Sequence, residues 1–253
     1  SDEVLFEKGY NRVYDTLEME ANLNQLSEIL EYVWERDIEG EGPWSSSRIC
    51  RIVGAELEER NEGPGILRSA YRRGVPVYIP AFTDSEMGLD FATWAMQRGT
   101  ESVDEVTRKD FFNTIPPFNP FYDLQDYAKR VAKTKSLGIL TIGGGVPRNW
   151  AQQVGPYFDI TAHRLEIELP HPRFKYAVRI CPEPVHWGGL SGCTYSEGVS
   201  WGKFISPDDG GKFAEVHSDA TLALPLLAKA LFEWMDGQGL TPEKKSASST
   251  SQS

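Results

Sequence analysis

The sequence predicts an α/β fold in which helices cover both faces of a mostly parallel sheet. Two observations predict it: short apolar runs typical of buried strands recur along the chain, and segments of helical apolar spacing alternate with them. The 253 residues are enough for one large core. We therefore expect residues 1–239 to form a single domain. Residues 240–253, rich in Ser, Thr and Lys, are expected to form a disordered tail.

The first half of the chain is expected to be mainly helical. Apolar residues at helical spacing predict four helices, over Thr16–Arg36, from Ser45 onward, over Ile66–Arg73 and over Met87–Met96. Gly74 closes the third of these. The apolar run Val75–Phe82 is consistent with a buried strand. Residues 100–120 are polar and then rich in proline, which predicts an excursion over the surface.

The second half alternates helices with strands. Three strands are expected, at Gly138–Ile142, Tyr176–Ile180 and Phe213–Val216. The helices are expected over Asp123–Lys135, around Asn149–Val154 and, strongly apolar, over Ala220–Trp234. This order implies a sheet whose strands run mostly parallel.

Composition narrows the classes of function. The formal net charge of -11 argues against a protein that binds nucleic acid, and it is compatible with a polyamine substrate or a basic protein partner. No apolar run is long enough to span a bilayer. Cys50, Cys181 and Cys193 lie far apart without the paired spacing of a metal site, which suits a reducing compartment. We expect a cytoplasmic protein without a structural metal.

The segment Ser196–Lys203 combines three groups that suit amine chemistry. A lysine that loses its proton near neutral pH, here Lys203, attacks an imine or carbonyl carbon and holds the fragment covalently. The indole of Trp201 offers an apolar wall and a π-face for an ammonium group. The carboxylate of Glu197 binds that cation or moves its protons.

Further groups follow the predicted strands. Gly143, Gly144 and Gly145 come directly after one strand and before a helix, where the backbone approaches a ligand closely or simply makes a tight turn. Asp84 follows another apolar run, and either bonds a ribose hydroxyl or caps a helix. Asp219, which Ala220 follows, is foremost a candidate for a helix N-cap and only secondarily a ligand-binding group. In an α/β fold these positions converge along one edge of the sheet.

Taken in order, these segments resemble the C-terminal two-thirds of deoxyhypusine synthase. The matching segments are Gly9–Val13, Pro80–Asp84, Gly143–Val146, Tyr176–Val178, Ser200–Lys203 and Asp219–Leu222. The resemblance implies a Rossmann-like fold that binds NAD. Its NAD contacts would be Asp84, Gly143, Gly144, Gly145, Asp219 and Ala220. Glu197, Trp201 and Lys203 would face the polyamine, with Lys203 and Glu197 catalytic.

The resemblance also implies a reaction. NAD takes hydride from spermidine, Lys203 captures the resulting imine and expels diaminopropane, and an acceptor amine then receives the aminobutyl group before hydride returns. The acceptor would be a lysine on a translation factor.

The chain departs from the family pattern around the substrate. Asn149 and Gln153 stand where the eukaryotic enzymes have histidine and asparagine, and Trp187 and Leu190 stand where two aspartates are expected. Asp90 lies one position beyond the expected substrate-binding aspartate. His186 and Trp187 are candidate replacement residues for the pocket. Structural roles explain these two residues equally well: Trp187 as a packed aromatic side chain and His186 as a hydrogen-bonded loop histidine.

Three functions therefore stay open: formation of hypusine on a protein lysine, formation of homospermidine from putrescine, and a catalytically silent partner subunit. The family carries further sequence before the region of resemblance. We expect a homo- or hetero-oligomer, tetrameric in its core, in which another chain or a separate N-terminal half completes each site.

Overall fold

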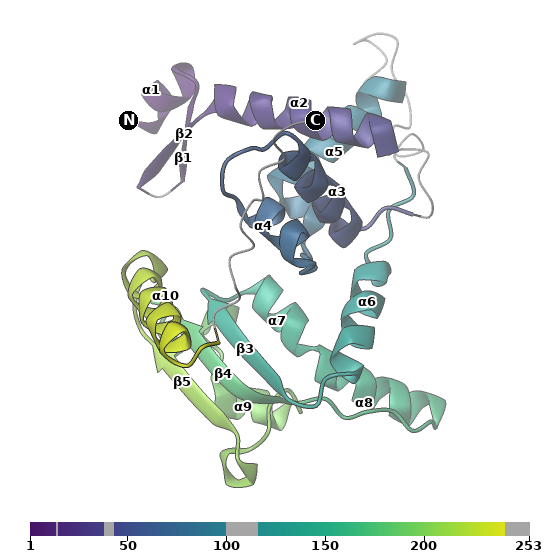
Figure 1. The fold of residues 1–253 in the computed structure, drawn as a ribbon, viewed down its shortest axis with the longest axis vertical. Coiled ribbons are helices and arrows are strands. Elements are labelled where there is room, and N and C mark those ends of the chain that lie inside the picture. The colour runs from purple at the N-terminus through teal and green to yellow at the C-terminus, as the bar shows by residue number, and fades with distance from the viewer. Residues whose placement is uncertain (14, 38–42, 100–115, 241–253) are drawn as a thin grey trace, which may run out of the picture. The chain divides into compact units, whose positions relative to one another are not determined.

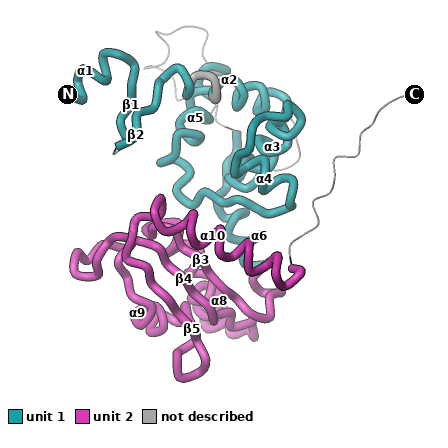
Figure 2. The backbone as a smooth tube through the Cα atoms, turned by 60° about the vertical axis from the view of Figure 1, so that its left-hand side comes forward, with its two compact units in different colours: residues 1–130 teal, residues 131–253 magenta. Residues whose placement is uncertain are grey.

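The computed structural model describes residues 1–240 apart from residues 14, 38–42 and 100–115. The chain divides into two compact units, residues 1–130 and 131–253 (Figure 2). Residues 241–253 of the expected tail fall outside the described residues, as does most of the expected excursion over residues 100–120. A single domain over residues 1–239 stays a prediction.

The first unit is mainly helical, as expected. Its elements are α1 (Asp2–Glu7), β1 (Tyr10–Val13), β2 (Thr16–Met19), α2 (Glu20–Asp37), α3 (Ser46–Glu59), α4 (Ile66–Arg73), a 3-10 turn (Phe82–Asp84), α5 (Glu86–Gly99) and α6 (Phe121–Ala132), which crosses the unit boundary (Figure 1). Three predicted helices are confirmed closely. Ser45 caps α3 by accepting a hydrogen bond from the Arg48 amide. Gly74 ends α4 in the left-handed conformation, with φ 65°.

Two predictions for this unit are wrong. The helix predicted from Thr16 begins at Glu20, because Thr16–Met19 forms β2 and pairs antiparallel with β1. Val75–Phe82 forms no strand. Pro76 and Pro80 have no amide hydrogen to donate to a ladder, and the Ile79 amide donates to Ser46 Oγ at 2.7 Å. An apolar run becomes a strand only where a neighbouring strand pairs with it, and the described residues offer none.

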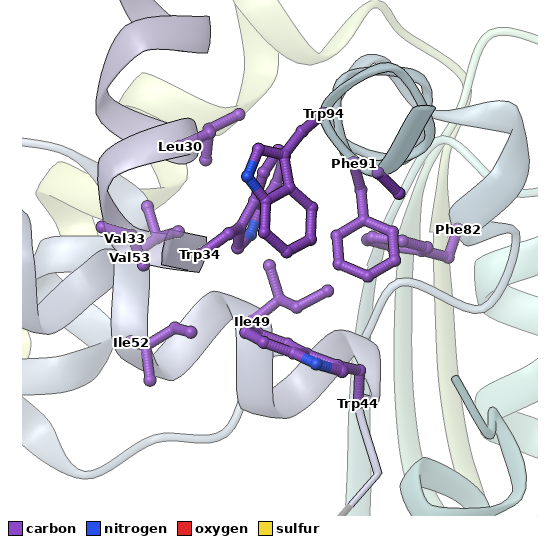
Figure 3. Close-up of a cluster of buried hydrophobic side chains, with 11 residues drawn as sticks. Leu30, Val33, Trp34, Trp44, Ile49, Ile52, Val53, Phe82, Phe91 and Trp94 are labelled. Carbon is purple, nitrogen blue, oxygen red and sulfur yellow. The ribbon is translucent and has the colours of Figure 1, made fainter. Parts of the chain in front are cut away.

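An aromatic core holds the first unit together (Figure 3). Trp34 of α2 meets Phe91 of α5 edge to face, with ring centroids 5.3 Å apart. Trp44 and Ile49 close the cluster from the side of α3. Such aromatic pairs add about 1 kcal/mol each beyond the area that they bury. This core fixes α2, α3 and α5 against one another.

The second unit contains the parallel sheet. Its elements are β3 (Leu137–Ile142), α7 (Val146–Gln152), α8 (Val154–Leu165), β4 (Phe174–Ile180), two 3-10 turns (Val185–Trp187 and Leu190–Gly192), α9 (Tyr195–Ser200), a third turn (Pro207–Asp209), β5 (Lys212–Val216) and α10 (Ala220–Gly237). All three strands predicted for this half are confirmed, and so is the apolar final helix. The mixed α/β class is therefore correct.

The strand order explains where the helices lie. The order is β3-β4-β5, with both pairs parallel, so both crossovers move in the same direction across the sheet. Right-handed crossovers then place α7, α8 and α9 on one face. On that face Tyr195 of α9 stacks on Phe213 of β5, with ring centroids 4.8 Å apart. The other face, which includes Leu140 and Tyr176, is about half exposed.

Within the described residues, no helix combines the length and the apolar character needed to cross a membrane.

Candidate active site

Lys203 lies in the tight turn that follows α9, beside the start of β4. Gly202, with φ 66°, makes the reversal after α9. The Lys203 amide donates to the Gly198 carbonyl at 2.9 Å, and the Lys203 carbonyl accepts from the Phe174 amide at 3.0 Å. The backbone of Lys203 is thus tied on both sides to regular structure.

The amine of Lys203 is partly buried and has one defined partner. Its Nζ donates to Oδ1 of Asn149, on α7, at 2.9 Å. Burial lowers the pKa of Lys203, and the cation of Arg148 lowers it further, while Cys193 and Glu197 act in the opposite direction. A lowered pKa increases the fraction of neutral amine, which is the nucleophilic form.

Glu197 and Trp201 belong to the same pocket, at opposite ends of α9. The Glu197 amide donates to the N-capping Oγ1 of Thr194 at 3.2 Å, and the Cys193 thiol lies 3.7 Å from Glu197 Oε1. Trp201 is 64% exposed. The space between the pocket side chains is about 20 Å³, room for roughly one water. A longer ligand must therefore lie along the exposed indole.

Two buried arginines hold the loop that carries Cys193. Arg148 donates to the carbonyls of Ser191 and Cys193 at 3.1 and 2.9 Å. Arg179 donates to the same two carbonyls and, at 2.9 Å, to Glu215 on β5. Burial lowers the pKa of Arg148, and the neighbouring Arg179 lowers it further. Two cations tolerate this proximity because carbonyl oxygens and one carboxylate surround them.

The sequence interpretation missed Arg148, Arg179, Cys193 and Gln152. One signal was available: Arg179 is a charged residue inside the otherwise apolar strand Tyr176–Ile180, and a charge in a buried strand needs a partner. Nothing local marks the other three. Gln152, which is buried, lines the Lys203 pocket, whereas the predicted Gln153 is exposed at the end of α7.

The triple glycine lies beside the same pocket. Gly143 and Gly145 have φ near 75°, and Gly145 is the N-cap of α7, the helix that carries Asn149. A Cβ on Gly144 would lie 2.6 Å from the Cα of Ser191. Close approach of the 190–193 loop therefore requires glycine at position 144.

Asp219 is confirmed as the N-cap of α10, whose first residue is Ala220. Its Oδ1 accepts from the amide and the hydroxyl of Thr221 at 2.8 and 2.6 Å, and these bonds lower the pKa of Asp219. Asp219 follows β5 and the glycines follow β3, so both lie at the carboxyl edge of one parallel sheet.

The residues that line the Lys203 pocket do not include the remaining predicted residues. Asp84 ends the 3-10 turn before α5, and Asp90, on α5, accepts from Ser27 Oγ at 3.2 Å; both belong to the first unit. His186 and Trp187 stack edge to face with centroids 6.3 Å apart, and Trp187 is 71% exposed. Their roles stay predictions.

The sequence was compared with known proteins. The sequence model of the deoxyhypusine synthase family matches residues 1–231. This chain belongs to the deoxyhypusine synthase family. A probable deoxyhypusine synthase 2 of Methanosarcina mazei is 34% identical over 235 residues, which are 92% of this chain and 60% of that protein. A protein of the same description from Archaeoglobus fulgidus is 30% identical, over 90% of this chain and 66% of its own length. A deoxyhypusine synthase-like protein of Elusimicrobium minutum is also 30% identical, over 89% of this chain and 54% of its own length.

Family membership confirms the resemblance inferred from the sequence. The chain spans between 54% and 66% of the length of these three relatives. Their descriptions name deoxyhypusine synthases or similar proteins, and they favour neither the putrescine-accepting alternative nor the silent subunit.

Proposed function

We propose that this chain catalyses NAD-dependent transfer of an aminobutyl group from spermidine, with Lys203 as the covalent carrier. The observation that supports it most is the Lys203 amine: it is partly buried, has a lowered pKa, and bonds Asn149 in a chain of the deoxyhypusine synthase family. The acceptor that we propose is a lysine on a translation factor, in a reducing cytoplasm.

Lys203 acts as a nucleophile in this proposal. Its neutral amine adds to the imine carbon of oxidised spermidine, and the bond from that carbon to the diaminopropane nitrogen then breaks. Diaminopropane leaves with a proton, and the aminobutyl group stays on Lys203 as an imine. The acceptor amine adds to the same carbon and displaces Lys203. Asn149 Oδ1, 2.9 Å from Nζ, orients the amine for the first addition.

Glu197 and Trp201 serve the cationic end of the substrate. Glu197 is in the pocket at the start of α9, where a carboxylate accepts the proton that each addition releases. Trp201 covers the butyl chain and presents its π-face to the terminal ammonium.

The residues at the carboxyl edge of the sheet fit a dinucleotide. A Cβ on Gly143 would meet open space, so the backbone there is accessible. Both hydrogen bonds of Asp219 fall on Oδ1, and among the described residues Oδ2 takes none, which leaves it for a ribose hydroxyl. Gly143, Gly144, Gly145, Asp219 and Ala220 would hold NAD here. Asp84, in the first unit, is proposed separately as an NAD contact. Bound NAD would accept a hydride from the polyamine carbon and return it to the product imine.

Borohydride trapping tests the proposal. The protein is incubated with spermidine and NAD, reduced and digested, and an aminobutyl mass should appear on the peptide that contains Lys203. Lys203→Ala should lose the adduct, whereas Lys212→Ala, which removes an exposed lysine of the same unit, should keep it. Full turnover by Lys203→Ala would rule the mechanism out. Product analysis with putrescine in place of the acceptor protein distinguishes the homospermidine alternative from transfer to a protein lysine.

A further inference from the structure

A cavity of about 460 Å³ opens on the first unit. It lies between α3, α4, the segment 75–77 and α6, and all its lining residues fall between Ser47 and Arg130. The Lys203 pocket is lined only by residues 148–203, so the two sites share no residue.

Two glycines shape this cavity. A Cβ on Gly54 of α3 would lie 2.6 Å from the Leu67 carbonyl, so α3 and α4 touch at this point only because residue 54 has no side chain. Gly74 turns the chain back after α4 along the cavity wall. The apolar part of the wall comes from Cys50, Leu67, Ala70, Val75, Pro76 and Val77.

The charged residues of the lining differ in whether an opposite charge pairs with them. Arg48 donates to Asp37 Oδ2 at 3.0 Å, and Arg130 donates to Asp126 Oδ2 at 2.8 Å. Asp126, which also accepts from the Tyr78 hydroxyl at 2.5 Å, is thus occupied. Arg51 is exposed and has no ion pair or hydrogen bond within the described part of the chain. The cavity therefore presents one unpaired positive charge beside apolar walls, which repels a polyamine and attracts an acid.

We infer that this cavity binds a small molecule that has a ring-containing apolar body and one acidic group. The volume lies in the range of small-molecule sites, and apolar walls with few polar groups are typical of them. The apolar walls take the body of the ligand. Arg51 binds the acidic group through charge-assisted hydrogen bonds, and the hydroxyl of Tyr71, also in the lining, supplies a second donor.

The probe for this site is 1-anilinonaphthalene-8-sulfonate, an aromatic monoanion whose fluorescence rises in apolar surroundings. Titrated against the full chain, it should saturate a single site. Ala70→Phe fills the cavity from α4 and should weaken binding at least tenfold. Arg51→Gln should weaken it about fivefold, as expected for loss of one charged hydrogen bond. Arg73→Gln removes an exposed arginine of α4 that does not line the cavity, and should leave the affinity unchanged.

A neutral probe with the same rings, N-phenyl-1-naphthylamine, separates the two contributions. Its binding should fall in Ala70→Phe and stay unchanged in Arg51→Gln. Val77→Met narrows the cavity from the segment after α4, so it replaces Ala70→Phe if that variant loses its helical circular dichroism. Failure of the wild-type chain to bind the anion overturns the proposal. Equal affinity of the anion for all these variants would also overturn it, and so would a loss of binding in Leu226→Ser. Either result would mean that the dye binds another apolar surface, such as α10.

Discussion

The protonation of Lys203 is set by groups within a few side chains of its amine. Burial favours the neutral form, and so does the cation of Arg148, whose guanidinium is held in place by two loop carbonyls. The neighbour in direct contact, Asn149, is neutral. Within the described part of the chain the amine therefore bonds no carboxylate, which suits a nucleophile better than a salt bridge would.

Asn149→Asp tests this electrostatic balance with almost no change of shape. A carboxylate 2.9 Å from Nζ would stabilise the ammonium form and raise the pKa of Lys203. The pH midpoint for acetylation of Lys203, followed by peptide mass spectrometry, should rise by about one pH unit or more. Turnover near neutral pH should fall correspondingly.

Gln153→Glu is the matched control, since it adds the same charge at the exposed end of α7. It should leave the midpoint almost unchanged. An Asn149→Asp protein with the wild-type midpoint would show that the hydrogen bond to Asn149 is not formed in solution.

At the scale of the element, α9 is positioned by contact with the chain that follows it. A Cβ on Gly198 would lie 2.6 Å from the ring of Phe204, which is itself buried against Tyr195. The same glycine supplies the carbonyl that accepts from the Lys203 amide. Packing of α9 and placement of Lys203 therefore depend on one residue.

Gly198→Ala should destabilise the protein by about 2 kcal/mol, because an overpacked site costs more than the gain in helix propensity. Gly237→Ala, in α10 with open space around its Cβ, should be neutral or slightly stabilising. Urea unfolding measures both. Equal midpoints for the two variants would contradict the close packing of α9 on Phe204.

The N-terminus of α3 is anchored by a single carboxylate. Asp123 of α6 accepts four hydrogen bonds, from the amides and hydroxyls of Ser46 and Ser47, at 2.5 to 3.0 Å. Asp123 is 4% exposed, so removal of its carboxylate leaves buried donors unpaired.

Asp123→Ala should therefore cost about 3 kcal/mol in the free energy of unfolding, measured in urea. Asp209→Ala removes an exposed aspartate of the other unit and should change the stability by less than about 0.5 kcal/mol. A loss below about 1 kcal/mol for Asp123→Ala would mean that water replaces these bonds at little cost.

At the scale of the whole molecule, α10 leaves much apolar surface uncovered. Leu222, Leu226, Phe232 and Trp234 are between 59% and 70% exposed. Exposed large apolar side chains gathered on one helix are typical of a protein–protein contact. This exposed apolar surface supports self-association of the chain.

We predict that the purified chain self-associates through α10. Light scattering should give a mass well above the 28.4 kDa of one chain, and Leu226→Glu with Phe232→Glu should reduce it. Lys229→Glu, a charge change on the same helix, is the control. An active, monodisperse species of 28.4 kDa would refute the shared-site assembly.

The sequence by itself determined the features that depend on neighbouring residues. Apolar spacing and Gly74 placed α4 at its observed ends, because capping and helical periodicity act within one or two turns. The three strands of the second unit and the N-cap role of Asp219 followed in the same way. Ser196–Lys203 predicts amine chemistry without any knowledge of the fold, and this prediction awaits the trapping experiment.

Only the tertiary structure decided the features that need a distant partner. Val75–Phe82 has the composition of a strand, but pairing requires a neighbour, and its Ile79 amide binds Ser46 instead. Asn149 reaches Lys203 across 54 residues, and Arg148 reaches the Cys193 carbonyl across 45. No local pattern encodes these distances, because they arise where crossovers on one face of the sheet bring α7 and the loop before α9 together.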